Sequence, residues 1–333
     1  MTDGRHPPMA QQAQGGTAPI LLRTIGLTKR FGAIVAVDGL DLEVRSGEVF
    51  GFLGPNGSGK STTVGMILGL IRPTAGRIEF RGRDLAAQRT AATRAIGAII
   101  ETPAFYPFLS GRDNLRALSI AAGGVPERRI DELLELVGLR ERAGSQYKTY
   151  SLGMKQRLGI ASTLLTDPEL VILDEPTNGL DPAGQREIRE LIPMLARQGH
   201  GVLLASHLLN EVQQVCHRVA IIRRGRLIQT GTVAELVQRD AYLELFLPAG
   251  DLERAAAVVQ MLPFVGQVTV VDGRLRIVAP REQGATINRA LAEAGLYASA
   301  IVPRESSLED VFLELTEDDQ PGERRDADVA TAA

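Results

Sequence analysis

The sequence predicts an α/β protein with a parallel sheet, followed by a smaller α+β unit, and three patterns indicate this. Short apolar runs recur without alternating polar residues, as expected of strands that are covered on both faces. Helical patterns follow several of these runs, which is typical of β–α repeats. Near Asp240 the pattern changes once, and shorter elements in a different order begin.

The first unit is predicted to cover residues 20–240. Its candidate strands are Val49–Leu53, Ala98–Ile100, Leu170–Leu173, Val202–Ala205 and Val219–Ile222. The stretches Ser61–Leu70 and Pro182–Ala196 are predicted to be helices that follow such strands. Residues 111–169 have little strand character, and we expect a helical insert there.

The second unit is predicted to cover residues 241–316. Its apolar pattern predicts the order strand, helix, strand, strand, helix and strand, with one more helix at the end. The predicted elements are Tyr242–Leu247, Asp251–Leu262, Gln267–Val271, Arg274–Val278, Gln283–Ala294, Tyr297–Val302 and Leu308–Leu315. The dipeptide Asp272-Gly273 is a strong hairpin signal between two of the strands. The order βαββαβ is that of a small ferredoxin-like module.

The composition is that of an ordinary globular protein with a full hydrophobic core. The chain has 333 residues, of which 44% are hydrophobic and 23% are charged. The net charge of −3 argues against broad nucleic-acid binding, because such binding needs clustered basic residues. The single cysteine, Cys216, cannot form an intramolecular disulfide, and its apolar helical surroundings favour a role in the core.

Both ends of the chain are polar, and no apolar run has the length of a membrane span. Residues 1–19 are predicted to be a flexible head, and residues 317–333 a disordered acidic tail. No secretory signal is visible near the start. A spanning helix needs about 20 mostly apolar residues, whereas the longest uncharged run contains Gln260, Pro263 and Gly266. A role at a membrane would therefore come through a partner.

A glycine-rich segment after the first apolar strand matches the phosphate-binding pattern G-x-x-x-x-G-K-[ST]. Glycines let the backbone N–H groups approach a triphosphate closely, and the helix that follows directs its positive end at the same anion. Lys60 can reach the β- and γ-phosphates, and the Ser61 hydroxyl can ligate Mg²⁺. The predicted ATP-binding residues are Gly54, Pro55, Asn56, Gly57, Ser58, Gly59, Lys60, Ser61 and Thr62.

Two adjacent carboxylates, Asp174 and Glu175, end the apolar strand Leu170–Leu173. Strands of parallel sheets carry ligands at their carboxyl ends. Asp174 is therefore suited to hold Mg²⁺, and Glu175 to polarise an attacking water. The alternative for either residue is a solvated acid at a strand exit, which the phosphate-binding pattern makes less favourable.

Together with a third segment, these motifs resemble the ABC ATPase family, over residues 20–240. The third segment, Tyr150–Arg157, is similar to the family signature, usually Leu-Ser-Gly-Gly-Gln. The resemblance implies a P-loop NTPase core with a helical signature subdomain, in which Ser151 and Gly153 face a nucleotide. Ser151 can also be a plain helix N-cap, and the two roles are compatible.

The resemblance assigns roles to further residues by their position. Phe31 corresponds to the aromatic that stacks on adenine, although it can also be an apolar residue at a strand edge. Asn178–Asp181 corresponds to the loop that crosses the dimer interface, with Asp181 at its end. His207 corresponds to the histidine that contacts the γ-phosphate. Ordinary structural roles are expected for His6, His200 and His217.

Two features depart from the usual family pattern. Glu101 occupies a position where the family has Gln; a carboxylate there can still bind Mg²⁺ or water. Met154 and Lys155 replace the last Gly and Gln of the signature, and Lys155 adds a cation near the nucleotide of a partner. Both variants resemble exporters of antibiotics, bacteriocins and lantibiotics, and Ser307–Phe312 resembles the carboxy-terminal appendage of such drug-exporter ATPases.

The resemblance implies an ATPase that binds ATP and Mg²⁺ and powers a separate transmembrane permease. The catalytic residues would be Lys60, Glu175 and His207, and the metal ligands Ser61, Asp174 and Glu101. Two copies would dimerise head to tail and bind the permease near residues 101–115, at the cytoplasmic face of the cell membrane. No nucleic-acid partner is expected.

Two other functions stay open at this point. One is a soluble ABC ATPase that acts on ribosomes or DNA, although such relatives generally carry two cassettes or a long coiled-coil insert. The other is a regulatory subunit that senses ATP with little turnover, which Glu101 and the altered signature would suit.

Overall fold

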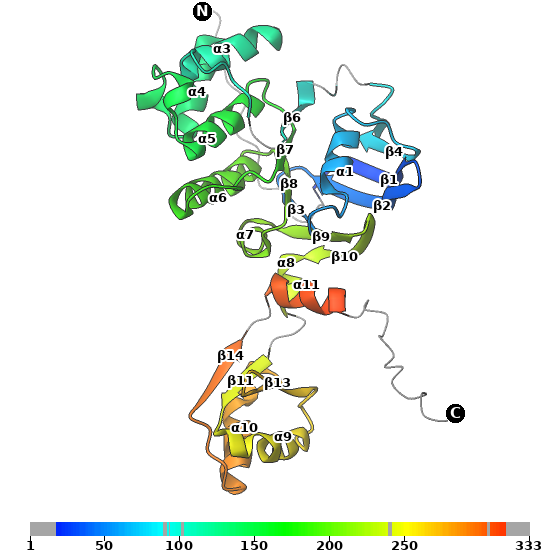
Figure 1. Cartoon of the computed structure of the whole chain (residues 1–333), viewed down its shortest axis with the longest axis vertical. Coiled ribbons are helices and arrows are strands. Elements are labelled where there is room, and N and C mark those ends of the chain that lie inside the picture. Colours follow the sequence, from blue (N-terminus) through cyan, green and yellow to red (C-terminus); the bar gives the residue numbers. More distant parts are fainter. Residues whose placement is uncertain are drawn as a thin grey trace, which may run out of the picture.

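The computed structural model describes residues 18–88, 92, 94–100, 103–238, 242–304 and 307–317, and only the backbone of residues 313–317. Residues 1–17 of the predicted head and residues 318–333 of the predicted tail lie outside the described residues. Glu101 lies outside them as well. In Figure 1 the first part of the chain forms the larger upper body, and strands β11 to β14 form a smaller body below it.

The central sheet of the upper body carries the strands that the apolar runs predict. Its order is β10-β9-β3-β8-β7-β6, and its neighbours from β9 to β6 pair in parallel. The strands are β3 (Val49–Leu53), β6 (Ile96–Ile99), β7 (Leu170–Asp174), β8 (Gly201–Ser206), β9 (Arg218–Arg223) and β10 (Arg226–Thr232). Every residue of β3, β7 and β8 is buried. The predicted strands are thus confirmed, apart from shifts at their ends.

Helices and a second sheet cover the two faces of this sheet. Val171 and Leu173 of β7 join the core cluster on one face, and Leu170 and Ile172 join the cluster on the other, so the strand is buried on both sides. The helices are α1 (Lys60–Ile67), α3 (Gly111–Ala121), α4 (Glu127–Leu136), α5 (Leu152–Thr163), α6 (Pro182–Arg197), α7 (Leu209–Val215) and α8 (Val233–Gln238). None of the described helices is both long and apolar enough to cross a membrane.

The predictions miss an antiparallel sheet, and its residues show why. Its order is β2-β1-β4-β5, and the strands are β1 (Ile20–Phe31), β2 (Ile34–Arg45), β4 (Ala75–Phe80) and β5 (Arg83–Asp84). The β1–β2 pairing shifts register around Leu27, and such bulges break the two-residue alternation. Lys29 is half-buried and Arg30 is exposed, so no continuous apolar run marks this part of β1.

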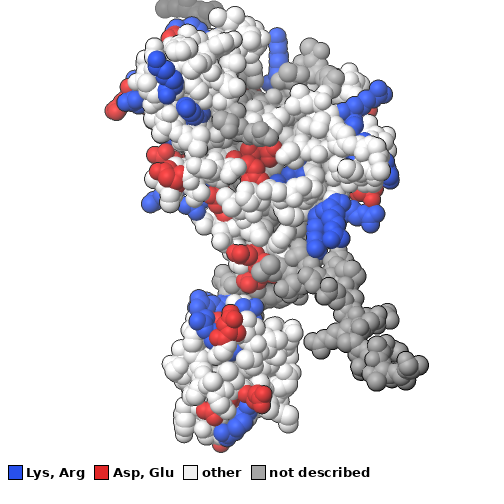
Figure 2. All heavy atoms as spheres, viewed as in Figure 1, with Lys and Arg blue, Asp and Glu red and all other residues white. Residues whose placement is uncertain are grey.

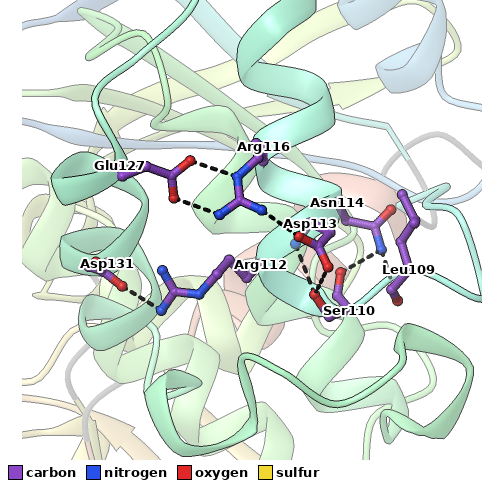
Figure 3. Close-up of polar contacts among 8 residues, drawn as sticks. All are labelled: Leu109, Ser110, Arg112, Asp113, Asn114, Arg116, Glu127 and Asp131. Carbon is purple, nitrogen blue, oxygen red and sulfur yellow. Dashed lines mark hydrogen bonds and ion pairs between the residues drawn. The ribbon is translucent and has the colours of Figure 1, made fainter.

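Ion pairs link the surfaces of helices α3 and α4, as Figure 3 shows. Arg116 Nε lies 2.6 Å from Glu127 Oε1, and Arg112 Nη2 lies 2.5 Å from Asp131 Oδ1. The hydrogen bond from Arg116 lowers the pKa of the Glu127 carboxyl. Ser110 is the N-cap of α3, and its hydroxyl accepts a hydrogen bond from the backbone N–H of Asp113 at 3.0 Å.

The lower body has an antiparallel sheet with the order β12-β13-β11-β14. Its elements are β11 (Tyr242–Phe246), α9 (Leu252–Gln260), β12 (Val268–Val271), β13 (Arg274–Val278), α10 (Gly284–Glu293) and β14 (Ala300–Arg304). Leu243, Leu245, Leu275 and Ile277 pack against the two helices in a separate core. The predicted strands and helices of this part are confirmed, although β14 begins at Ala300 rather than at Tyr297.

The opposite face of this sheet carries arginines that surround one glutamate. Glu244 Oε1 lies 3.2 Å from Arg274 Nη1, and its Oε2 lies 3.1 Å from Arg304 Nε. Burial acts to raise the pKa of Glu244, but the hydrogen bonds and charges of these arginines lower it in total. Figure 2 shows blue basic groups around a red patch on this body, where Figure 1 draws β11, β13 and β14.

Helix α11 (Leu308–Glu317) returns to the upper body, which differs from its predicted grouping with the second unit. Leu308 and Val311 are buried in the same core cluster as residues of α7 and α8. The backbone N–H of Leu308 also donates to Gln213 Oε1 of α7 at 2.8 Å. After the chain leaves the lower body, α11 packs against the upper body, so the lower body is connected to the upper one at both of its ends (Figure 1).

Buried Leu308 should be essential for holding α11 against α7 and α8. We expect Leu308→Ala to destabilise this packing by about 2 to 5 kcal/mol, the usual cost of a cavity at a buried leucine. Hydrogen exchange of the α11 backbone amides should become correspondingly faster. Glu309→Ala, at the next, exposed position, is the control, and equal exchange in both variants would contradict the assigned packing.

Candidate functional site

The candidate site lies where the carboxyl ends of parallel strands meet. Strand β8 lies between β3 and β7, so the segments that follow these three strands lie next to one another. The glycine-rich loop follows β3, Glu175 follows β7, and His207 follows β8. This edge is where open α/β sheets bind their ligands.

The loop after β3 is shaped by two glycines that cannot be replaced without moving the backbone. A Cβ atom on Gly54 would lie 2.4 Å from the Ile222 carbonyl oxygen. Gly59 has φ +109°, and a Cβ there would lie 2.6 Å from the Ala36 carbonyl oxygen. The loop thus packs tightly against β9 and the β1–β2 hairpin, and its conformation is set before any ligand binds.

Two polar side chains of the loop are buried inside it. Lys60 Nζ donates to the Gly54 carbonyl oxygen at 2.7 Å, and its residue is 5% exposed. The Ser58 hydroxyl is also buried, and no hydrogen-bond partner is found for it among the described residues. Since a buried hydroxyl without a partner costs free energy, an anion in the loop would satisfy it. These groups therefore fit a phosphate chain.

A polar pocket of about 550 Å³ opens beside the loop and α1. It brings together most of the predicted phosphate-binding residues and both predicted acids. Its lining residues are Ala36, Asn56, Gly57, Gly59, Lys60, Ser61, Thr62, Leu152, Gln156, Asp174, Glu175 and Asn178. Gly54, Pro55 and Ser58 belong to the same loop but do not line the pocket.

Glu175 lies between a cation and an imidazole. Its Oε1 is 3.5 Å from Lys60 Nζ, and its Oε2 is 2.8 Å from His207 Nδ1. Its φ of +50° is unusual for a residue with a side chain and changes the direction of the chain after β7. The Glu175 N–H donates to the Ala205 carbonyl oxygen at 2.9 Å, which holds this turn in place.

Asp174 and Ser61 offer oxygen ligands in the same pocket. The Asp174 residue is only 1% exposed, and Ser61 lies in the first turn of α1. Mg²⁺ prefers hard oxygen ligands and is often held by one or two protein groups together with substrate phosphates. The donor set of this pocket therefore fits a magnesium–nucleotide complex.

The signature segment lies at the start of α5. The hydroxyl of Ser151 accepts a hydrogen bond from the Met154 N–H at 3.2 Å, so Ser151 is the N-cap, and its side chain is exposed. Gly153 packs near Gly184 of α6, where an added Cβ would be in ordinary contact. Lys155 Nζ lies 5.3 Å from the centre of the Tyr147 ring. Neither Ser151 nor Gly153 lines the pocket of its own chain.

Phe31 and Asp181 also lie outside the pocket. Phe31 ends β1 at the tip of the β1–β2 hairpin and is 49% exposed, with Lys29 Nζ 4.8 Å from its ring centre. Asp181 is the N-cap of α6, where its carboxylate accepts from the Gly184 N–H at 3.0 Å. Among the predicted site residues that do not line the pocket, Phe31, Ser151 and Asp181 are exposed, whereas Ser58 is buried in the loop.

The structure adds residues to the site that sequence reasoning did not single out. Ala36 of β2 lines the pocket, and no sequence pattern marks an alanine for such a position. Gln156, within the signature segment, is buried and lines the pocket. Its neighbours Lys155 and Arg157 are also polar, so the sequence pattern does not mark Gln156.

The structural interpretation of two histidines is confirmed. His200 Nδ1 donates to the Pro168 carbonyl oxygen at 2.6 Å, and His217 Nδ1 accepts from the Val49 N–H at 2.9 Å. His6 lies outside the described residues. Cys216 is buried as predicted, and its burial raises the pKa of the thiol.

Comparisons with known proteins agree with this geometry. The family described as "ABC transporter" matches residues 37–178. The bacitracin transport ATP-binding protein BcrA of Bacillus licheniformis is 40% identical over 89% of this chain and 97% of its own length. The daunorubicin resistance ATP-binding protein DrrA3 of Streptomyces coeruleorubidus is 38% identical over 89% of this chain and 95% of its own.

Solved structures of similar fold include an ATP-binding subunit of an ABC transporter, with a TM-score of 0.59, 33% identity and coverage of 66% of this chain and 92% of that one. CbiO1 of Clostridium perfringens, part of an ABC transporter complex, has a TM-score of 0.60 and 27% identity, covering 74% and 96%. The chain therefore belongs to the ABC transporter family and is one of its ATP-binding subunits, which hydrolyse ATP to drive transport.

Proposed function

We propose that this chain powers the export of an antibiotic peptide, a drug or a similar compound through a separate transmembrane permease. The observation that carries this is the extent of the likeness: relatives named for bacitracin transport and daunorubicin resistance match 89% of the chain. A relative named for linearmycin resistance in Bacillus subtilis matches the same share. The likeness therefore includes the lower body as well as the ATPase core.

The glycine-rich loop binds the triphosphate of ATP in this proposal. Backbone N–H groups of residues 54–62 surround the phosphates, and the N-terminus of α1 adds its positive end. Lys60 exchanges its bond with the Gly54 carbonyl for the β- and γ-phosphates. Phe31, exposed at the hairpin tip, stacks on the adenine from outside the pocket.

Ser61 and Asp174 would hold Mg²⁺ in the pocket. The metal, when bound, would neutralise charge that develops on the phosphates. Glu101, the third ligand expected from the sequence, lies outside the described residues and stays a prediction.

Glu175 would act as the general base that orients and polarises the attacking water. Its ion pair with Lys60 and its contact with His207 hold the carboxylate at the entrance to the phosphate loop. His207 would position Glu175 in this way and also contact the γ-phosphate. Positioning and electrostatics are the main means of catalysing phosphoryl transfer.

A second copy of the chain would complete the site. Ser151 and Gly153 lie at an exposed helix N-terminus, away from the pocket of their own chain. A helix N-terminus is suited to stabilise an anion, so this one can close over ATP that is bound to a partner. Asp181 would lie at the same interface in a head-to-tail dimer. Loss of the γ-phosphate would remove this link and open the dimer.

The permease would bind at an exposed apolar loop before α3. Phe108 is 71% exposed and Tyr106 66% exposed, which is unusual for aromatic side chains that cover no core. Asn114, only 1% exposed, holds the loop rigid by donating to the carbonyl oxygens of Tyr106 and Ser110. Figure 3 shows Asn114 directed at Leu109 and Ser110. A rigid apolar surface costs little entropy when it binds.

This contact would place the protein at the cytoplasmic face of the membrane. We also propose a division of the chain near residue 240, with residues 20–240 as the ATPase domain and residues 111–169 as its signature subdomain. The second domain, assigned to residues 241–316 from the sequence, would be ferredoxin-like: the strand order β12-β13-β11-β14 with two helices on one face supports this. Helix α11 would then serve both parts.

Glu175→Gln should abolish turnover while ATP binding remains, because the amide keeps the shape of the carboxylate but cannot act as a base. We expect steady-state ATP hydrolysis to fall by about 100- to 10,000-fold, the range for loss of a general base. Glu169→Gln, at the half-buried position just before β7 and at the opposite end of the strand from the pocket, is the matched control and should keep normal turnover. Unchanged hydrolysis in Glu175→Gln would contradict the assignment and favour an ATP sensor.

Phe108→Asp should weaken binding to the permease, because it places a charge at the centre of the exposed apolar loop. Copurification with the permease should be reduced, while ATP binding by the isolated chain should not change. Ile120→Asp, which alters an equally exposed residue near the other end of α3, should copurify normally. Equal permease binding by all three proteins would rule out this loop as the docking surface.

A further inference from the structure

The sheet of the lower body has two edge strands that differ in their protection. The edge strand β14 contains Pro303, which has no N–H to donate, and Arg304, which carries a charge. Both features discourage pairing with another strand. The other edge strand, β12, consists of Val268, Thr269, Val270 and Val271, and so has neither proline nor charge.

The backbone of β12 is free to pair along its outer side. Within residues 242–304, its hydrogen bonds go to β13 alone. Val270 is 50% exposed and Val271 is 40% exposed, and Met261, which follows α9, is 85% exposed. An unprotected edge strand of β-branched residues is a template for another strand.

Other surfaces of this body are less suited to a second copy of the chain. The sheet face opposite the helices carries Arg274, Arg276 and Arg304 around the single carboxylate of Glu244. Two such faces would repel each other, because like charges would be buried together. Edge pairing avoids this repulsion, since it keeps both arginine faces in solvent.

The sequence of β12 is complementary to itself in an antiparallel pair. When the twofold axis is perpendicular to the sheet, the helices of both copies lie on the same side of the joined sheet. Directly opposed residues then point to the same side, so one residue of β12 must lie opposite its own copy, at the axis. With Thr269 on the axis, Thr269 lies opposite its copy and Val268 lies opposite Val270. Pairs of β-branched residues and of threonines are favourable across antiparallel strands. With Val270 on the axis instead, Val268 would lie opposite Asp272, which is less favourable.

We propose that β12 pairs antiparallel with β12 of a second copy, with Thr269 at the twofold axis, so that one sheet continues through both lower bodies. The inference rests on the proposed dimer only for the identity of the partner. The contact itself uses no nucleotide, so it would hold two subunits together while the ATP sites are open. The strand would thereby raise the local concentration of the two ATPase domains.

Cysteine crosslinking of the full-length protein, without nucleotide, tests this register. Directly opposed residues of antiparallel strands have Cα atoms about 4.5 to 5.5 Å apart, which suits a disulfide. Thr269→Cys should therefore form disulfide dimers under mild oxidation. The native Cys216 is buried and should contribute little background.

Two variants serve as controls. Val271→Cys lies on the same face of β12 but away from the axis, and Ala300→Cys lies on the protected edge strand β14. Both should crosslink at least about tenfold more slowly, because Cα atoms more than about 7 Å apart cannot be bridged without backbone movement. Equal rates for Thr269→Cys and either control would overturn the proposal. Crosslinking of Thr269→Cys only to a permease would overturn it as well.

A second measurement separates this contact from the ATP-dependent dimer. Val270→Lys places a charge on the edge and should abolish self-association of the nucleotide-free protein in sedimentation experiments. ATP should still dimerise Val270→Lys when Glu175→Gln is present to prevent hydrolysis. Failure of that ATP-driven step alone would count against the proposed head-to-tail dimer and not against pairing of β12. Self-association of Val270→Lys equal to that of the unaltered protein would overturn the edge pairing.

Discussion

The ion pair between Lys60 and Glu175 is the interaction on which the rest of the site depends. It joins the loop after β3 to the end of β7 across the intervening strand β8, with 3.5 Å between Nζ and Oε1. Both groups are largely removed from water, and charges interact more strongly in such an environment than in water. In the proposed function, a triphosphate that enters the pocket would compete for Lys60, and Glu175 would then face the γ-phosphate. The parallel sheet makes this geometry possible, because it brings three strand ends to one edge.

The rest of the upper body supports that edge. Buried β3, β7 and β8 fix the positions of the loop, the acids and His207, and tight packing at Gly54 and Gly59 fixes the loop itself. Residues that would act on a partner lie on exposed helix starts and hairpin tips. The lower body, tied back by α11, adds an edge strand suited to a second copy. In the proposed dimer, each subunit would carry half of each of these interfaces.

The parts of the fold and of the candidate site that one physical signal dominates could be predicted from the sequence. Strand β3 and the loop 54–61 were predictable because a buried apolar run precedes a pattern that only a phosphate site needs. Strand β1 was not predictable, since the bulges near Leu27 and the charged residues Lys29 and Arg30 hide its alternation. The placement of Leu308 could not be predicted either. The apolar pattern around it predicts a helix but does not indicate which of the two bodies buries that helix. Ala36 lines the pocket from β2, a strand of the sheet that the sequence does not reveal, so no motif marks it.

The most direct test of the central claim is a calorimetric titration of the folded protein with ATP and magnesium, compared with Lys60→Ala. The unaltered protein should bind ATP with magnesium. The affinity of Lys60→Ala should be about 10- to 100-fold lower, since a charge-assisted hydrogen bond contributes about 1.5 to 3 kcal/mol. Equal affinities, in two proteins that circular dichroism shows to be equally folded, would contradict a role of Lys60 in binding the triphosphate.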